Sequence, residues 1–246
     1  MRVATGLKVA VVGKGGAGKS SVAGTLCREL ARRGERVLAL DLDTMPGLGL
    51  SLGLDAPRAR LPSGLAERVE GKGWQVKHGV RPATLVDRYA ATGPDGIRFL
   101  ELGKLPHGVE PTVTVAFRHV LERFRRVGWA VVADLAAGTR QPMFGWARFA
   151  RTVLVVVDPS AKALLTARRL VRAGVGTHLV ANNVRDGADL AAIRDAVALP
   201  LLGCVPFDPS VIEAERRGQA PIDVAPSAPA VSAMRRLADA LAEAAR

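Results

Sequence analysis

The chain has 246 residues, 48% of them hydrophobic, and a formal net charge of +12. This length is sufficient for one α/β domain with a well-buried core, and no low-complexity linker divides it, so we expect a single domain over residues 1–246. The absence of a signal peptide, a lipidation signal or a run of about eighteen apolar residues predicts a cytoplasmic protein rather than a secreted or membrane-spanning one.

Apolar strand patterns alternate with amphipathic helix patterns along the chain. Strands that are apolar throughout are typical of a sheet covered by helices on both faces. We therefore expect an α/β fold with a doubly wound, mostly parallel sheet. The predicted strands cover 7–12, 36–41, 97–102, 129–134, 152–157, 175–182 and 200–205, and the predicted helices cover 18–33, 112–127, 161–173, 187–197, 209–217 and 228–245.

The segment 48–96 has the weakest pattern. It is rich in Gly, Pro and Arg, with a short strand expected at 74–77 and a helix at 83–91. We interpret it as a mobile insertion within the single domain.

Residues 13–20 read Gly-Lys-Gly-Gly-Ala-Gly-Lys-Ser, between the first predicted strand and the first predicted helix. This is the Walker A spacing, in which backbone N–H groups surround phosphate oxygens, the final lysine neutralises charge and the serine hydroxyl faces Mg²⁺. The helix N-terminus adds its partial positive charge. We therefore predict that ATP and Mg²⁺ bind here, contacted by Gly13, Lys14, Gly15, Gly16, Ala17, Gly18, Lys19, Ser20 and Ser21.

A second lysine, Lys14, follows the first glycine of this loop. Lys-Gly-Gly-x-Gly-Lys-Ser resembles the deviant Walker A motif of the MinD/ParA/CooC group of ATPases, which is related to the nitrogenase iron protein and the arsenite pump. The resemblance implies an ATP-dependent sandwich dimer and slow Mg²⁺-dependent hydrolysis stimulated by a client, with Lys14 reaching the phosphates of the partner copy as an arginine finger does. Lys19 would bind the phosphates of its own copy. A solvated loop lysine is the alternative interpretation of Lys14.

Two carboxylates, Asp41 and Asp43, end the predicted strand 36–41 and begin the turn that follows. Their spacing of two places both on one side of the strand at the carboxyl end, where open parallel sheets bind ligands. The same family resemblance implies that Asp43 orients the attacking water and that Asp41 supports the Mg²⁺ shell. The alternative is that both cap the turn 44–47.

The predicted strand 129–134 also ends in an acid, Asp134, with Gly138 four residues later. This spacing resembles the switch II motif of the same ATPases. The resemblance implies that Asp134 holds Mg²⁺ through water and that the N–H of Gly138 senses the γ-phosphate.

The base of the nucleotide is assigned to two later segments. Asn182 resembles the family's asparagine at the adenine edge, and the segment Pro206, Phe207 and Asp208 resembles the one that lines the base. A turn containing Asn182 and Asn183 is the alternative interpretation.

The positive charge leaves two interpretations open. Paired arginines, for example 32–33, 125–126, 168–169, 216–217 and 235–236, favour a nucleic-acid or anionic-lipid surface, whereas a composition-wide arginine bias needs no ligand. Cys27 and Cys204 are expected to be buried apolar residues.

The motifs predict the ATP switch better than they predict its task. Our preferred interpretation is a MinD/ParA-type switch that acts on an unidentified protein client. One alternative is a CooC-type metallocentre-maturation ATPase, although the chain lacks the Cys-x-Cys pair of those proteins and has only His107 and Glu110 in that region. The other is a ParA-like positioning ATPase that rides on nonspecific DNA. Membrane cycling is not expected from the Ala- and Leu-rich C-terminal helix, and Mg²⁺ is the one metal expected.

Overall fold

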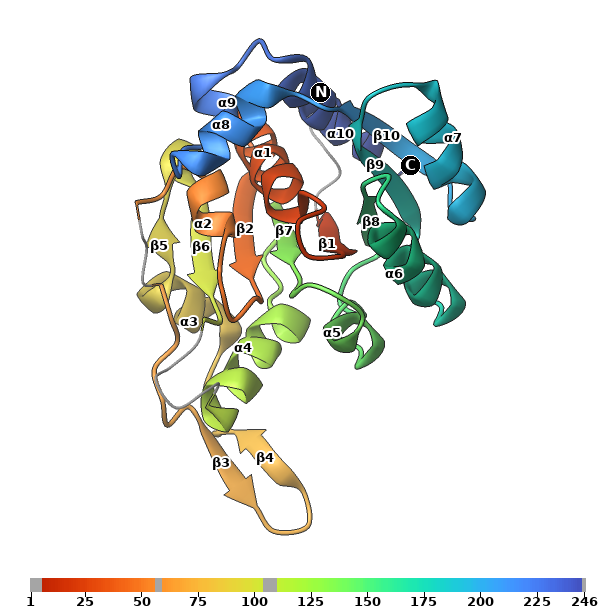
Figure 1. Ribbon diagram of the computed structural model, residues 1–246. Helices are drawn as coiled ribbons and strands as arrows, with labels where there is room; N and C mark the ends of the chain where they lie inside the picture. The colour runs from red at the N-terminus through yellow and green to blue at the C-terminus, as the bar shows by residue number, and fades with distance from the viewer. Residues whose placement is uncertain (1–5, 56–58, 104–109, 245–246) are drawn as a thin grey trace.

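The computed structural model of the protein describes residues 6–55, 59–103 and 110–244. Its centre is an eight-stranded sheet in the order β10-β9-β8-β1-β7-β2-β6-β5 (Figure 1). All neighbouring strands pair in parallel except β5, which runs antiparallel to β6 at the edge. The doubly wound α/β fold predicted from the sequence is confirmed. The strands are β1 (Lys8–Gly13), β2 (Arg36–Asp41), β5 (Ala91–Thr92), β6 (Arg98–Glu101), β7 (Trp129–Asp134), β8 (Thr152–Val157), β9 (His178–Val184) and β10 (Leu201–Pro206).

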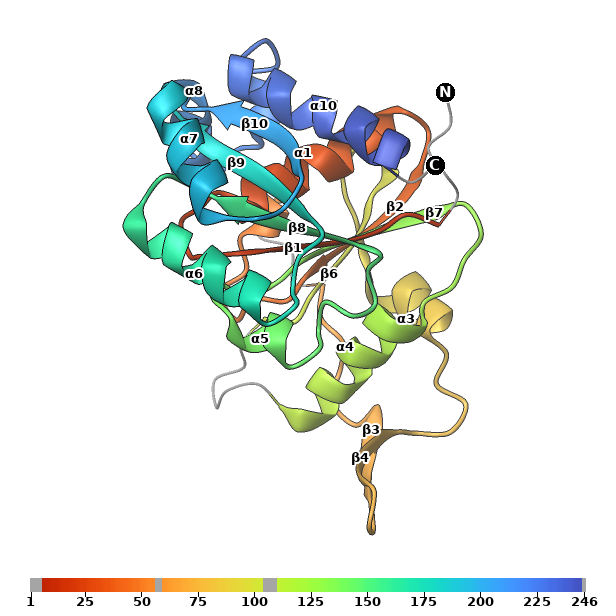
Figure 2. The same ribbon diagram turned by 90° about the vertical axis from the view of Figure 1, so that its right-hand side faces the viewer.

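Helices cover both faces of this sheet (Figure 2). One face packs against α1 (Lys19–Arg32), α2 (Leu48–Ser51), α9 (Pro221–Val224) and α10 (Pro229–Ala244). The other packs against α3 (Pro82–Tyr89), α4 (Pro111–Arg123), α6 (Ala161–Arg172) and α7 (Gly187–Ala196). Two further helices, α5 (Arg140–Met143) and α8 (Pro209–Arg216), follow β7 and β10.

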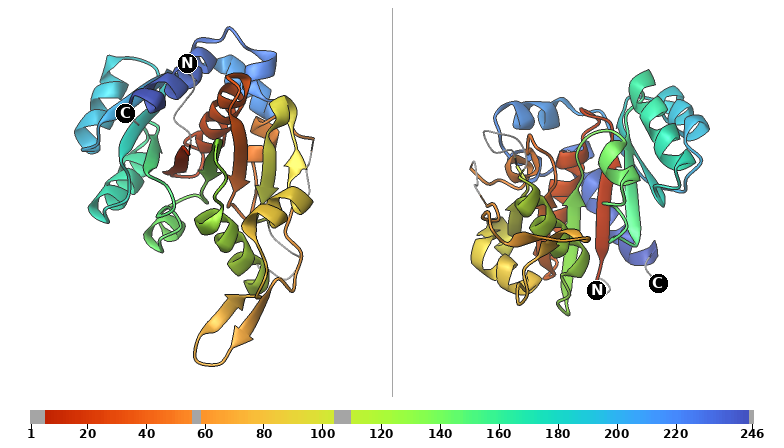
Figure 3. Two further views of the ribbon diagram at one scale, coloured as in Figure 1. Left: turned by 180° about the vertical axis from the view of Figure 1, so that it is seen from behind. Right: turned by 90° about the horizontal axis from the view of Figure 1, so that it is seen from below.

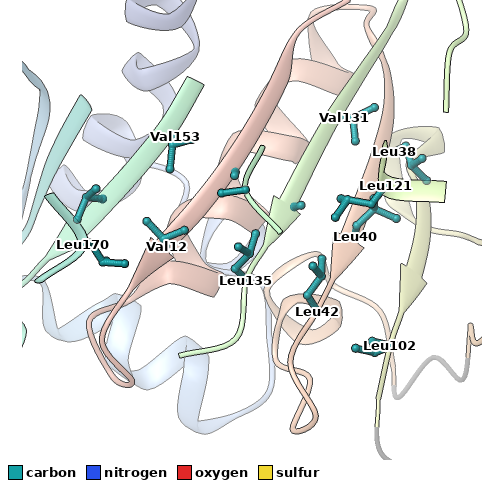
Figure 4. Packing of buried hydrophobic residues seen from close by; sticks show 14 of the residues in the cluster. Val12, Leu38, Leu40, Leu42, Leu102, Leu121, Val131, Leu135, Val153 and Leu170 are labelled. Carbon is teal, nitrogen blue, oxygen red and sulfur yellow. The ribbon is translucent and has the colours of Figure 1, made fainter. Parts of the chain in front are cut away.

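The two hydrophobic layers come from the alternation of side chains along each strand. In β1, Val9 and Val11 belong to the layer under α1 and α10, whereas Ala10 and Val12 belong to the layer under α4 and α6. Because successive strand residues point to opposite faces, a strand that is apolar at every position supplies both layers. Figure 4 shows part of the second layer, where Val12 of β1 and Leu40 of β2 lie on the same side of the sheet, with β7 between their strands.

The segment 48–96 contains more regular structure than the sequence predicted. The expected strand and helix are present as β4 (Gly73–Val76) and α3. Two further strands were not expected: β3 (Ala66–Val69), which pairs antiparallel with β4, and the two-residue strand β5. The β3–β4 hairpin projects from the body of the protein beyond α4 (Figures 1 and 3). Because much of the hairpin is exposed, its sequence lacks the apolar pattern that reveals the buried strands. The mobility of this segment stays a prediction.

No helix in the described ranges is both long enough and apolar enough to cross a bilayer.

Candidate nucleotide-binding site

The loop 13–20 joins the carboxyl end of β1 to the first turn of α1, in the arrangement the motif requires. Two of its glycines are required by close contacts. A Cβ on Gly13 (φ +151°) would lie 2.4 Å from the carbonyl oxygen of Val156, and a Cβ on Gly18 (φ +85°) would lie 2.1 Å from Nδ2 of Asn182. The loop can therefore keep its amide-lined curve only with glycine at these positions.

The Walker A serine and the acid at the end of β7 meet directly. Ser20 Oγ donates a hydrogen bond of 2.6 Å to Oδ2 of Asp134. The other oxygen, Oδ1, is buried and has no hydrogen-bond partner within the described part of the chain. A buried, unpartnered carboxylate oxygen beside a serine hydroxyl fits a hard divalent cation, either directly or through water. The residues present therefore fit Mg²⁺.

The ionisation of Asp134 reflects this burial. Burial raises the pKa of Asp134 to about 6, and the charge of Asp43 acts in the same direction. Lys19 and the Ser20 hydroxyl oppose that rise. Lys19 is itself 7% exposed, and its ammonium group donates to the carbonyl oxygen of Lys14 at 3.5 Å. The ammonium group of Lys19 therefore offsets part of the effect of burial on Asp134.

Asp41 caps the turn that follows β2. Its Oδ1 accepts from the N–H of Asp43 at 3.0 Å, and its Oδ2 accepts from Gly47 at 3.0 Å and Leu48 at 2.9 Å. Burial, followed by the charge of Asp134, raises the pKa of Asp41 to about 7. The structure thus gives Asp41 the capping role that the sequence left open, and its support of Mg²⁺ stays a prediction.

Asp43 connects the two segments that resemble the family's switches. Its Oδ1 accepts from the N–H of Met45 at 3.1 Å, and its Oδ2 accepts from the N–H of Ala137 at 3.4 Å. The N–H of Gly138 donates to the carbonyl oxygen of Gly13 at 2.9 Å. Gly138 is therefore held against the phosphate loop, and this bond has to open before the same N–H can contact a γ-phosphate.

Gln141 is a site residue that the sequence reasoning missed. Its Nε2 donates to the carbonyl oxygen of Leu42, and its Oε1 accepts from the N–H of Ala136, both at 2.9 Å. One side chain therefore joins the turn after β2 to the turn after β7. The sequence offers no spacing rule for this glutamine, since the contact with Leu42 spans 99 residues.

A cavity of about 290 Å³ opens beside the phosphate loop, between the carboxyl ends of β9 and β10 and helix α8. Its lining includes Asn182, Asn183, Pro206 and Asp208 together with residues 16 and 18–21 of the loop. The cavity lies where the sequence predicted the nucleoside.

Asn182 has a structural task in this cavity. Its Nδ2 donates to the carbonyl oxygen of Ala17 at 2.8 Å, and the residue is 6% exposed. The amide nitrogen of Asn182 therefore holds the phosphate loop, and contact with adenine stays a prediction that must involve the other amide atom or a rearrangement.

The segment after β10 has a divided role. Asp208 lines the cavity and also caps α8, since its Oδ1 accepts from the N–H of Ser210 at 3.0 Å. Phe207 is 36% exposed, and the guanidinium of Arg185 lies over its ring, 4.6 Å from the ring centroid.

Glu215 of α8 is a second site residue that the sequence reasoning missed. Its carboxylate accepts a hydrogen bond from the hydroxyl of Ser21 across the cavity.

Many of the paired arginines are neutralised by acids. Arg32 pairs with Asp95 and Asp223, Arg33 pairs with Glu29 and Asp239, and ion pairs also hold Arg126, Arg216, Arg217 and Arg235. Both arginines therefore have an acidic partner in the pairs 32–33 and 216–217, and one of the two has such a partner in 125–126 and 235–236. The net charge alone does not identify a continuous basic face.

The described residues contain no group of three or more His, Cys, Asp or Glu side chains placed to hold a metal ion. Cys27 is buried and Cys204 is half-buried. Burial raises the pKa of the Cys27 thiol far above its usual range, so it resists forming a thiolate. His107 lies outside the described residues.

The profile of the CobQ/CobB/MinD/ParA nucleotide binding domain matches residues 8–222. The chain belongs to this family. The resemblance predicted from residues 14–20 is confirmed.

Individual members of the MinD/ParA family match along nearly the whole chain. The carbon monoxide dehydrogenase accessory protein CooC of Rhodospirillum rubrum is 29% identical over 245 residues, which are 90% of this chain and 91% of that protein. The septum site-determining protein MinD of Pyrococcus horikoshii, solved with Mg-ADP, is 22% identical, with a TM-score of 0.72 and 97% of each chain covered. MinD in the MinC:MinD cell division complex of Aquifex aeolicus is 20% identical, with a TM-score of 0.70 and 96% of this chain and 95% of that chain covered. The solved structures confirm the fold.

Proposed function

We propose that this protein is a Mg²⁺-dependent ATPase that forms a sandwich dimer when ATP is bound and acts as a molecular switch on a protein client. The observation that carries the proposal is the joined arrangement of the phosphate loop, the bond between Ser20 and Asp134, and the unpartnered Oδ1 of Asp134. Together they supply a phosphate cradle and a place for a divalent cation.

The residues of the site have separate tasks in this proposal. Lys19 and the loop amides bind the β- and γ-phosphates, and Ser20 and Asp134 hold Mg²⁺, which neutralises charge that develops during phosphoryl transfer. Asp43 orients the attacking water. Because phosphoryl transfer depends on alignment and charge, these groups need no covalent role.

Lys14 is the group assigned to the partner copy. The described part of the chain offers its ammonium group no ion pair, although the group lies beside the phosphate loop and within reach of Gly16. A half-buried lysine without a counter-ion at the mouth of a phosphate site is available for a second nucleotide.

Large exposed apolar side chains also flank the two switch segments, namely Met45, Met143 and Phe144. Burial of such residues in an interface would favour association.

Calorimetric titration with ATP and Mg²⁺ tests this function. Wild-type protein should bind one ATP per chain, and Lys19→Ala should abolish binding because the site loses its main charge on the phosphates. Lys162→Ala removes an exposed lysine of α6 and serves as the matched control, with unchanged affinity expected. Equal affinity in Lys19→Ala and Lys162→Ala would refute the assignment of the site.

A metallocentre-maturation task of the CooC type is the second candidate, supported by the 29% identity to the R. rubrum protein. The missing Cys-x-Cys pair argues against a thiolate metal site. Elemental analysis of the purified protein after incubation with nickel and zinc separates the two tasks. A stoichiometric transition metal that disappears in His107→Ala would favour maturation, whereas no bound metal favours the client switch.

A ParA-like task on DNA is tested by binding to an arbitrary duplex in the presence of ATP. If DNA is the surface on which the protein acts, affinity should fall steeply as salt rises, because each neutralised phosphate releases counter-ions. If the protein does not bind the duplex at low salt, the DNA task is excluded and action on a protein client remains the proposal.

A further inference from the structure

A second cavity, of about 560 Å³, lies at the opposite end of the sheet from the phosphate loop. It is formed at the amino ends of β1, β7 and β8, where Lys8, Trp129 and Arg151 are located, and by the loop between α4 and β7. The six residues of β1 separate it from the phosphate loop by about 20 Å. Figure 2 shows the loop between α4 and β7 at the end of the strands away from the loop that follows β1.

Four cationic side chains line this amino-end cavity, and no carboxylate is among its described lining residues: the cations are Lys8, Arg125, Arg126 and Arg151. Arg126 is the one with an acidic partner, Asp87, outside the lining. Lys8 and Arg125 both donate to the carbonyl oxygen of Phe124, at 3.4 and 3.0 Å, so their charges lie close together. Arg151 makes no hydrogen bond or ion pair within the described part of the chain.

Burial and the neighbouring positive charges both disfavour the charged form of Lys8. Burial, followed by the charges of Arg125 and Arg151, lowers the pKa of Lys8 from 10.5 to about 8. By contrast, the neighbouring Arg28 and Arg32 of α1 share the acids Asp95 and Asp223. An uncompensated cluster raises the energy of the folded protein unless an anion joins it.

Aromatic side chains form the apolar part of the same cavity. The rings of Phe124 and Trp129 meet edge to face, with centroids 5.7 Å apart. The guanidinium of Arg126 lies over both rings, at 6.0 and 5.7 Å. Phe149 completes the aromatic lining, and Val127 is 90% exposed at the edge. Cations beside a hollow of aromatic surface are suited to a ligand with an anionic group and a planar or apolar group.

We propose that the amino-end cavity binds a small phosphorylated molecule, with its phosphate on Lys8, Arg125 and Arg151 and its planar or apolar part against Trp129 and Phe149. A phosphate monoester is preferred over a carboxylate because its charge of almost −2 at neutral pH matches Lys8, Arg125 and Arg151, which have no acidic partner in the described part of the chain. Guanidinium groups also match the geometry of phosphate oxygens. A cavity of this volume lies within the range of small-molecule sites, whereas a nucleic-acid backbone needs an extended groove.

Phenyl phosphate is the probe, titrated calorimetrically into the full chain. The Lys19→Ala variant is used as the parent, so that the phosphate loop does not contribute and the result is independent of the nucleotide function. One phenyl phosphate should bind per chain, and inorganic phosphate should bind more weakly because it has no ring. Arg151→Gln should weaken binding about tenfold or more, since a charge-assisted bond is lost.

Arg148→Gln is the matched control, because it removes the same charge from an exposed site three residues away that does not line the cavity. Its affinity should equal that of the parent, and thermal melting confirms that both variants fold. The proposal is overturned if phenyl phosphate does not bind at up to about 10 mM. Equal affinity in Arg151→Gln and Arg148→Gln would overturn it as well. If inorganic phosphate binds as tightly as phenyl phosphate, the assignment of the aromatic residues to the ligand is wrong. If duplex DNA binds in an Arg151-dependent way and phenyl phosphate does not bind, the cavity is part of a nucleic-acid site instead.

Discussion

The contact between Gly18 and Asn182 permits a quantitative test of how the phosphate loop is held. Gly18 has φ +85°, and a Cβ there would lie 2.1 Å from Nδ2 of Asn182. Since the same amide nitrogen donates to the carbonyl oxygen of Ala17 at 2.8 Å, Gly18→Ala has to displace Asn182 and break that bond. The substitution therefore combines a backbone cost with the loss of a buried hydrogen bond.

The two contributions can be separated by size. An alanine in the left-handed region costs about 1 kcal/mol. A broken buried hydrogen bond that leaves Ala17 without its partner adds about 1–2 kcal/mol. Gly18→Ala should therefore lower the free energy of unfolding by about 2–3 kcal/mol, and Asn182→Ala by about 1–2 kcal/mol. In the Asn182→Ala background the added methyl group meets no amide, so Gly18→Ala should cost only its backbone term of about 1 kcal/mol.

Urea unfolding of nucleotide-free protein measures all four proteins of this double-mutant cycle. Gly16→Ala is the matched control: Gly16 has φ +80°, and a Cβ there would meet only Nζ of Lys14 at 3.8 Å, an ordinary contact. It should cost about 1 kcal/mol in either background. If Gly18→Ala and Asn182→Ala are additive, or if Gly16→Ala costs as much as Gly18→Ala, the steric account of this contact is wrong.

Three other predictions concern the switch segments and the buried acids. Gln141→Ala removes the hydrogen bonds to Leu42 and Ala136, so the rate of ATP hydrolysis should fall several-fold, whereas the ATP affinity measured by calorimetry should stay within about twofold. An equal loss of hydrolysis and affinity would contradict a bridging role for Gln141. Asp43→Ala should leave ATP bound but unhydrolysed, as measured by phosphate release, and normal turnover would exclude Asp43 from water alignment. The pKa of Asp41 is raised from 3.8 to about 7, so the folded protein binds a proton there more tightly than the unfolded chain does. The free energy of unfolding of metal-free protein should thus rise as pH falls from about 8 to about 5.5, and the rise should be smaller in Asp134→Asn. A free energy of unfolding that falls over that range would contradict the raised pKa.

Local sequence patterns were sufficient for the fold and for the phosphate loop. The buried strands are continuous apolar runs, and residues 13–20 carry a spacing whose geometry follows from glycine and lysine alone. The fold class and the family were predicted correctly for that reason. Strand ends were less accurate: β9 begins at His178 rather than at residue 175, because Gly174 and Gly176 adopt positive φ and extend the preceding turn.

The contacts that complete the site join distant parts of the chain, and no local pattern specifies them. Asn182 holds Ala17 across 165 residues, and Glu215 accepts from Ser21 across 194 residues. The sequence placed Asn182 near the nucleotide but could not show that its amide nitrogen is engaged with the loop. For Asp41, the family resemblance favoured support of Mg²⁺ and left turn capping as the alternative, whereas three backbone N–H donors in the folded protein support the capping role.

The mass of the protein in solution tests the central claim most directly. Light scattering of the wild type with Mg²⁺ and a non-hydrolysable ATP analogue should give a dimer, whereas ADP or no nucleotide should give a monomer. Lys14→Ala should bind the analogue but remain monomeric, because its ammonium group is assigned to the phosphates of the partner copy. A wild-type protein that stays monomeric with every nucleotide, or a Lys14→Ala variant that dimerises as the wild type does, would contradict the account.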